Sequence, residues 1–204
     1  MLTRLFCILL LLPVFPAHAN EPGEFAEARE VFLRAVDGDR RAVRDATLRF
    51  RTLSAAHPQE AVFIAYLGAC TTLQGRDGTN NIERRRLTEE GLREIDRALA
   101  LAVGAEQDPV RYLDAALVAA NSYIHVPSFF NRYDDARRLV REILAHPGFE
   151  RMADAYRAAA YMAAALLAQG DRDEEAYVQY LRLSVEADPE GRDGRLASGL
   201  LAEG

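Results

Sequence analysis

The stretch AYLGACTTLQG, from Ala65 to Gly75, decides the fold class together with GLREIDRALAL, from Gly91 to Leu101. Both have apolar residues at helical spacing, and a glycine ends the first. The stretch AQGDRDEEAYVQYLRLSVEADP, from Ala168 to Pro189, repeats the order of helix, glycine and second helix. A helical pair of this kind cannot bury its apolar face alone, so we expect such pairs to stack on one another.

The rest of the chain has the same period near 3.6, and no segment alternates apolar and polar residues as a half-buried strand would. Prolines such as Pro58, Pro109 and Pro147 mark where one pair ends and the next begins. We therefore predict an all-α chain of eight main helices in four antiparallel pairs. The expected helices span residues 24–36, 40–56, 59–74, 87–103, 109–120, 133–145, 150–168 and 173–187, with a short terminal helix at 195–201.

Two of these pairs resemble tetratricopeptide (TPR) repeats. Leu67-Gly68 followed by Gly75 is similar to the signature of the first helix, and Gly91, Ile95 and Ala98 are similar to that of the second. The motif is repeated with one added residue, at positions Gly170, Asp171, Ala176, Asp188 and Pro189. The resemblance implies a right-handed α-solenoid of about four units over residues 20–190, followed at 191–204 by a tail or a short capping helix. Other helical-pair repeats or an irregular helical array are alternatives.

The first nineteen residues have the features of a secretory signal peptide. Arg4 gives a positive start, Leu5 to Phe15 is almost wholly apolar, and Ala17-His18-Ala19 is a small-x-small cleavage site. We expect cleavage after Ala19 and export, with the periplasm as the location. The apolar run is shorter than the roughly 20 residues of a membrane span, and no later stretch is long enough. An uncleaved anchor is the alternative.

The charge balance disfavours nucleic acid as a partner. The formal net charge is −6, and removal of residues 1–19 takes away only Arg4, which leaves −7. Nucleic-acid binding relies on basic residues that neutralise phosphates. All 25 basic residues are arginine, so lysine Schiff-base chemistry and a lysine-bearing phosphate loop are excluded.

The chain has no motif for a metal, a cofactor or catalysis. Without Cys7 of the signal peptide, Cys70 stands alone in an apolar helix, where we expect a small buried residue rather than a reactive thiol. His57, His125 and His146 are not at ligand spacing, so we predict no metal site. No cofactor is expected, and we predict that the protein is not an enzyme. A hydrolase or transferase with a dispersed site near His125 and the arginines is an alternative.

Two of the turns within pairs look longer than those of the TPR family, at residues 75–91 and 121–133. Insertions of this kind often gather on one face, so the two turns would lie side by side. Arginine stacks on aromatic rings and pairs with carboxylate or phosphate. The predicted binding rim consists of Asn80, Asn81, Arg84, Arg85, Arg86, Tyr123, His125, Phe129, Phe130 and Arg132. Alternatively, these residues serve only local ion pairs and packing.

The second candidate site is the groove that first helices line in this family. An apolar groove lined by small side chains would suit an amphipathic helix or an extended peptide. Its expected residues are Val62, Ala65, Ala69, Leu73, Arg157, Ala160, Ala164 and Leu167. Alternatively, the groove is closed on itself or filled by the ends of the chain.

These features favour a periplasmic protein–protein interaction module or scaffold with a protein partner in the cell envelope. The alternative function is that of an accessory protein which binds an anionic small ligand, a lipid headgroup or a glycan through the arginine and aromatic rim.

Overall fold

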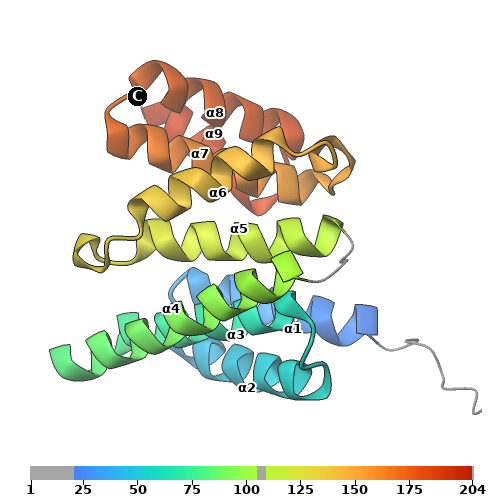
Figure 1. Cartoon of the computed structure of the whole chain (residues 1–204). Helices are drawn as coiled ribbons and strands as arrows, with labels where there is room; N and C mark the ends of the chain where they lie inside the picture. The colour runs from blue at the N-terminus through green and yellow to red at the C-terminus, as the bar shows by residue number, and fades with distance from the viewer. Residues whose placement is uncertain (1–20, 105–108, 204) are drawn as a thin grey trace, which may run out of the picture.

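The computed structural model describes residues 21–104 and 109–203, which form an all-helical protein without strands (Figure 1). The predicted all-α class is therefore confirmed for this part of the chain. The α-helices are α1 (Glu21–Val36), α2 (Arg40–Ala56), α3 (Ala61–Asp77), α4 (Asn81–Gly104), α5 (Pro109–His125), α6 (Tyr133–Ala145), α7 (Asp154–Asp171), α8 (Glu174–Ala187) and α9 (Arg192–Glu203). Two short 3-10 helices are η1 (Ser128–Phe130) and η2 (Phe149–Arg151).

Most helices pack against their neighbours in sequence. Contacts join α1 to α2, α3 to α4, α5 to α6, and α7 to α8. The helices α3, α5 and α7 also contact one another in order, and α9 packs on both α7 and α8. Figure 1 shows α5 between α1–α4 on one side and α6–α9 on the other.

The pair α3 and α4 comes close together because two glycines face each other. A Cβ atom on Gly68 would lie 2.7 Å from the backbone oxygen of Gly91, and one on Gly91 would lie 2.5 Å from the backbone oxygen of Gly68. Such distances are shorter than any ordinary van der Waals contact, so neither position has room for a side chain. The two glycines that suggested a repeat unit therefore set the separation of this pair.

An aromatic cluster holds α1 against α2 and α3. The rings of Phe50 and Tyr66 are stacked with their centroids 4.7 Å apart. Phe32 of α1 meets the edge of Tyr66 at 5.0 Å, and Phe25 lies 5.6 Å from the same ring. Aromatic pairs of this geometry contribute stability beyond the area that they bury, so the cluster fixes α1 beside α3.

The C-terminal helices have their own core. Leu113 of α5, Leu139 and Ile143 of α6 and Phe149 of η2 are buried in one apolar cluster. A smaller cluster lies under α9. Its fully buried members are Leu181, Ala165 and Ala197, with Met162 nearly so. The segment expected as a tail or short helix at 195–201 therefore forms the longer, packed helix α9.

The predicted long turn between α3 and α4 is wrong. Helix α4 begins at Asn81 rather than Leu87, which leaves only residues 78–80 outside helices. The Asn80 side chain accepts a hydrogen bond from the Glu83 amide at 3.0 Å, and the Glu83 carboxylate accepts from the Thr79 amide at 3.0 Å. These two hydrogen bonds resemble a capping box, except that Glu83 reaches the Thr79 amide instead of the amide of the cap residue Asn80. They start the helix six residues earlier than expected.

The turn after α7 is also shifted. Helix α7 continues through Gly170 to Asp171, and Arg172 ends it in a left-handed conformation with φ of 61°. The N-terminal cap of α8 is Asp173, whose side chain accepts from the Ala176 amide at 3.1 Å. Asp171, a position of the repeat motif, pairs with Arg137 of α6.

Residues 1–19, where we expect a signal peptide, lie outside the described part of the chain. Within residues 21–104 and 109–203, no helix combines the length and apolar character needed to cross a membrane.

Candidate binding cleft

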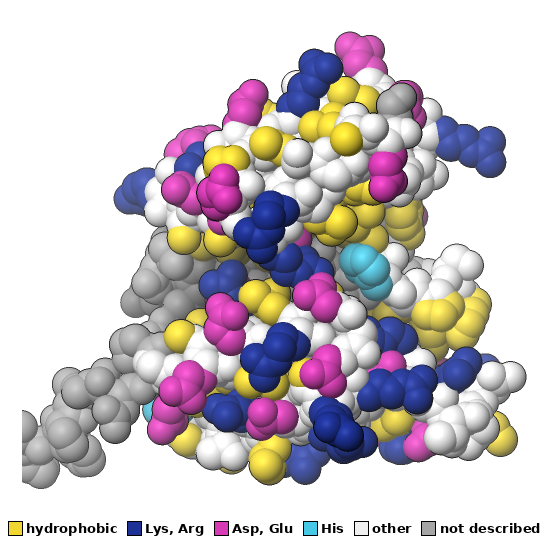
Figure 2. Space-filling model, turned by 180° about the vertical axis from the view of Figure 1, so that it is seen from behind, with side chains coloured by type: hydrophobic (Ala, Val, Ile, Leu, Met, Phe, Trp, Pro, Cys, Tyr) yellow, Lys and Arg dark blue, Asp and Glu magenta, His cyan; other side chains and the backbone are white. Residues whose placement is uncertain are grey.

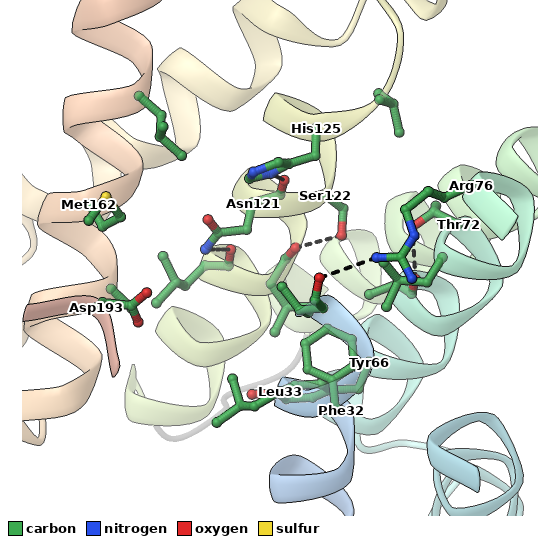
Figure 3. A pocket seen from close by; sticks show the side chains of 18 of the residues that line it. Phe32, Leu33, Tyr66, Thr72, Arg76, Asn121, Ser122, His125, Met162 and Asp193 are labelled. Carbon is green, nitrogen blue, oxygen red and sulfur yellow. Dashed lines mark hydrogen bonds between the residues drawn. The ribbon is translucent and has the colours of Figure 1, made fainter. Parts of the chain in front are cut away.

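A cleft of about 1390 Å³ lies between the N-terminal and C-terminal helices of the described chain. Figure 2 shows this hollow between the upper and lower parts of the molecule, on the face opposite to that of Figure 1. Its walls come from α1, α3, α5, α7 and α9, together with the first turns of α4 and the segment after α5. Figure 3 shows side chains from these five helices around the space.

The cleft has a largely apolar lining. Its aliphatic and aromatic residues include Phe32, Leu33, Leu73, Leu117, Val118, Met162, Leu166 and Leu196. Pockets for small molecules usually measure about 300–1,000 Å³ and combine apolar walls with a few polar groups. The cleft is larger than this range, so its size fits a polypeptide segment or a long apolar molecule.

A polar cluster lies on the lining where α1, α3 and α5 meet. The Tyr66 hydroxyl donates to Asp114 at 3.4 Å. Burial raises the pKa of Asp114, while the positive charge of Arg29 and the Tyr66 hydrogen bond oppose that shift. Interaction with Tyr66 also raises the pKa of Arg29. Because the three groups interact with one another, the cluster serves to join the helices.

A salt bridge connects two walls of the cleft that are distant in sequence. The Arg192 guanidinium, at the start of α9, lies 2.5 Å from the Asp37 carboxylate, just after α1. Arg192 also pairs with Asp193 at 2.6 Å. Burial raises the pKa of Asp193, and the adjacent Arg192 opposes this shift. The helices α1 and α9 thus flank the cleft and are joined beside it.

Arg76 joins α3 to the end of α1. Its guanidinium donates to the backbone oxygens of Val36 at 3.2 Å and Ala35 at 3.1 Å. The last carbonyl groups of a helix have no partners within the helix, and Arg76 satisfies two of those of α1. Sequence patterns do not reveal this role of Arg76, because its partners lie 40 and 41 positions away.

Six residues of the predicted rim line the cleft, and these are Asn81, Arg84, Arg85, His125, Phe129 and Phe130. The rings of Phe129 and Phe130 lie 4.3 Å apart, and the Phe129 side chain is 63% exposed. His125 shares a hydrogen bond of 2.7 Å between Nδ1 and the Asn121 backbone oxygen. The structure therefore brings arginine, histidine and aromatic side chains to one cavity, although no long turn carries the arginines.

Two other rim residues, one just before helix α4 and one within it, do not line the cleft. Asn80 caps the start of the helix. Arg86 pairs with Glu90 one turn later, with 2.9 Å between Nη1 and the carboxylate. Both residues therefore have a local role in capping or ion pairing, which was the alternative to a binding rim.

Tyr123 and Arg132 are also separate from the cleft. Tyr123 is buried, and its hydroxyl donates to Asp96 of α4 at 2.5 Å. The Arg132 guanidinium lies 4.6 Å from the centre of the Tyr123 ring and pairs with Asp135 at 2.9 Å. This network fixes the segment after α5 against α4 and α6, so both residues are structural.

Of the residues expected to line the groove, Ala69 and Leu73 line the cleft. Val62 and Ala65 are buried in the N-terminal core. Ala160, Ala164 and Leu167 are buried in the C-terminal core. Arg157 lies outside the lining and pairs with Asp154 at 2.7 Å.

On α7, the cleft is lined by a different stripe of residues from the one that the sequence suggested. The stripe through Ala160 and Leu167 faces the core, and the neighbouring stripe faces the cleft. That second stripe consists of Ala155, Ala159, Met162 and Leu166. Both stripes are apolar, so their composition could not show which of them packs inside.

The described residues offer no obvious metal site or reactive thiol. They contain no group of three or more histidine, cysteine, aspartate or glutamate side chains that could hold a metal ion. Cys70 is buried, and burial raises its pKa to about 12. The thiolate, which is the reactive form, is therefore scarce near neutral pH.

Comparison with known proteins identifies no relative. No family model, curated protein or solved structure matches the chain. Any proposal about its function therefore rests on the chemistry of the cleft.

Proposed function

We propose that the protein is a TPR-like interaction module that binds a segment of a partner protein in the cleft. Its architecture would be a right-handed stack of four antiparallel pairs, α1/α2, α3/α4, α5/α6 and α7/α8, with α9 as a terminal cap. The contacts between neighbouring helices and the close approach at Gly68 and Gly91 support this arrangement. The module would act by equilibrium binding, without a catalytic group or a cofactor.

The observation that carries this proposal is the size of the cleft combined with its apolar lining. An amphipathic helix binds by placing its apolar face in a hydrophobic groove, and an extended segment places alternate side chains in pockets. Leu33, Leu73, Leu117 and Leu166 could supply such contacts from four different helices. Burial of apolar surface would provide most of the driving force.

The location follows from the N-terminal sequence. Residues 1–19 support export and cleavage after Ala19, so we place the protein in the periplasm with a partner in the cell envelope. The net charge of −6 disfavours nucleic acid as that partner.

A second candidate function is binding of an anionic small ligand, a lipid headgroup or a glycan. Arg84, Arg85 and His125 near Phe129 and Phe130 favour it. Each arginine already makes one contact within the chain, however. Arg84 Nε donates to the Gly78 backbone oxygen at 2.8 Å, and Arg85 pairs with Glu89 at 2.8 Å. Protein binding through the larger apolar surface is therefore the first proposal.

The proposal can be tested by filling the cleft. Ala159 is a half-buried lining residue, whereas Ala26 on α1 is exposed outside the cleft. We expect Ala159→Trp to remove a partner that the wild-type protein captures by in-cell crosslinking, and Ala26→Trp to retain it. Equal capture by both variants would contradict binding in the cleft. If a ligand that binds the purified protein is released completely at high salt, the anionic ligand is favoured, because screening weakens exposed charge contacts more than apolar ones.

A further inference from the structure

The charges on the cleft lining are unevenly distributed. The residues that α3 and the first turns of α4 contribute include Arg76, Arg84 and Arg85 and no carboxylate. His125, at the end of α5, also lines the cleft. The carboxylates of the lining come from other elements. Glu30 lies on α1 and Asp114 on α5, and the junction of α8 and α9 contributes Asp188, Glu190 and Asp193 beside Arg192 and Arg195.

Two of these arginines have unused N–H hydrogen-bond donors. Arg85 is bonded through Nε to Glu89 at 2.8 Å, and its side chain is 70% exposed. Arg84 is bonded through Nε to the Gly78 backbone oxygen. The Nη groups of both side chains make no hydrogen bond to another residue of the described chain. A guanidinium has five N–H donors arranged to match a carboxylate, so both can accept a further anionic partner.

An exposed aromatic pair lines the same cleft. Phe129 and Phe130 lie on η1, just beyond His125, and Phe129 is 63% exposed. Large exposed aromatic side chains are uncommon on a surface without a binding role and are enriched at binding sites. The pair could pack against a bulky apolar side chain of an occupant.

We infer that the occupant of the cleft is a peptide segment with a bulky apolar residue beside one or more acidic residues. The acidic residues face Arg84 and Arg85, and the apolar residue packs on Phe129 and Phe130. This inference rests on the proposed function.

A random peptide library selected on the purified protein tests the inference. We expect the wild-type protein to enrich peptides that combine aromatic or large aliphatic residues with aspartate or glutamate. The enriched peptide then serves as the probe, and its dissociation constant is measured with Arg85→Gln. Removal of one exposed ion pair should weaken binding by about two- to fivefold at low salt, and this difference should shrink as salt is added.

Arg86→Gln is the matched control. Arg86 pairs with Glu90 as Arg85 pairs with Glu89, and its side chain is 63% exposed, yet it does not line the cleft. Its substitution should leave the affinity of the probe unchanged. An equal loss of affinity in both variants would overturn the inference.

The results of these experiments distinguish a failure of this inference from a failure of the proposed function. If the enriched peptides are apolar without acidic residues and Ala159→Trp abolishes their binding, the inference is wrong and the proposed function stands. If the library enriches no peptide that depends on the cleft, both fail. Binding of anionic lipid vesicles in place of peptides would also overturn both and support the second candidate function.

Discussion

At the scale of single residues, two glycines determine how closely α3 and α4 pack. We predict that Gly91→Ala lowers the free energy of unfolding by about 1–3 kcal/mol, the usual cost of overpacking. The new Cβ would lie 2.5 Å from the Gly68 backbone oxygen and 2.7 Å from the Thr72 amide nitrogen, and backbone atoms cannot easily move aside. Urea-induced unfolding measures the change.

Gly199→Ala is the control for this prediction. Nothing lies within 4 Å of a Cβ atom at Gly199 in α9. Alanine is a better helix former than glycine by roughly 0.5–1 kcal/mol, so this variant should be as stable as the wild-type protein or slightly more so. A Gly91→Ala protein with unchanged stability would show that α3 and α4 are not in close contact.

The carboxyl group of Asp114 should make stability depend on pH. Burial raises its pKa in the folded protein, against the opposing effect of Arg29. The folded state then binds more protons than the unfolded state, so the free energy of unfolding falls as pH rises from about 4, the ordinary carboxyl value, through the raised pKa. Asp114→Asn should flatten this part of the stability profile, measured by unfolding between about pH 4 and pH 7.

Asp39 should give the opposite dependence of the free energy of unfolding on pH. Backbone hydrogen bonds from Ala42 and Arg41 lower its pKa. Its stabilising effect is therefore present at neutral pH and is lost as pH falls below the ordinary carboxyl range. Asp39→Asn should flatten only the acidic limb of the profile. An Asp114→Asn profile with the same slope as the wild type between about pH 4 and pH 7 would contradict the raised pKa of Asp114.

Sequence patterns indicated several arginine and aromatic residues that line the cleft, but not the alanines of α7 that do so. Arg84, Arg85 and Phe129 were recognisable because arginine and aromatic residues were expected side by side in two neighbouring turns. Ala160 and Ala159 are neighbours on a helix that is apolar on most sides, and composition does not distinguish their faces. Only the packing of α7 on α5 and α6 decides which alanine is buried.

At the scale of helices, the hydrophobic period was sufficient for the number and type of elements. It failed at the start of α4, where the Asn80 and Glu83 side chains cap the helix although no serine or threonine occupies the cap position. The polar run from Arg84 to Glu90 then resembled an exposed loop. In the structure this run is helical, with Thr88 buried and with ion pairs between successive turns on its exposed side.

A proline substitution distinguishes a helix from a loop at this position. We predict that Arg86→Pro lowers the free energy of unfolding by about 3 kcal/mol and reduces helical circular dichroism, because proline in a helix interior removes a hydrogen bond and clashes with the preceding turn. Asn81→Pro should be tolerated, since proline is favoured at the first position of a helix. Equal tolerance of both substitutions would indicate that residues 81–90 form a loop.

At the scale of the whole molecule, the cleft depends on helices that are remote in sequence. Its walls include α1 and α9, and the salt bridge between Asp37 and Arg192 joins positions 155 residues apart. No local pattern predicts such a pairing. In the described part of the chain, the first and last helices flank this open space.

The central claim is that this open space binds a partner protein. The most direct test places a photoreactive phenylalanine analogue at Phe129 in the cleft and, separately, at Leu48, which is 63% exposed on α2 outside the cleft. Illumination in cells followed by mass spectrometry identifies what each position contacts. We predict one reproducible partner segment crosslinked from Phe129 and absent from Leu48. The same products from both positions, or none from Phe129, would contradict the claim.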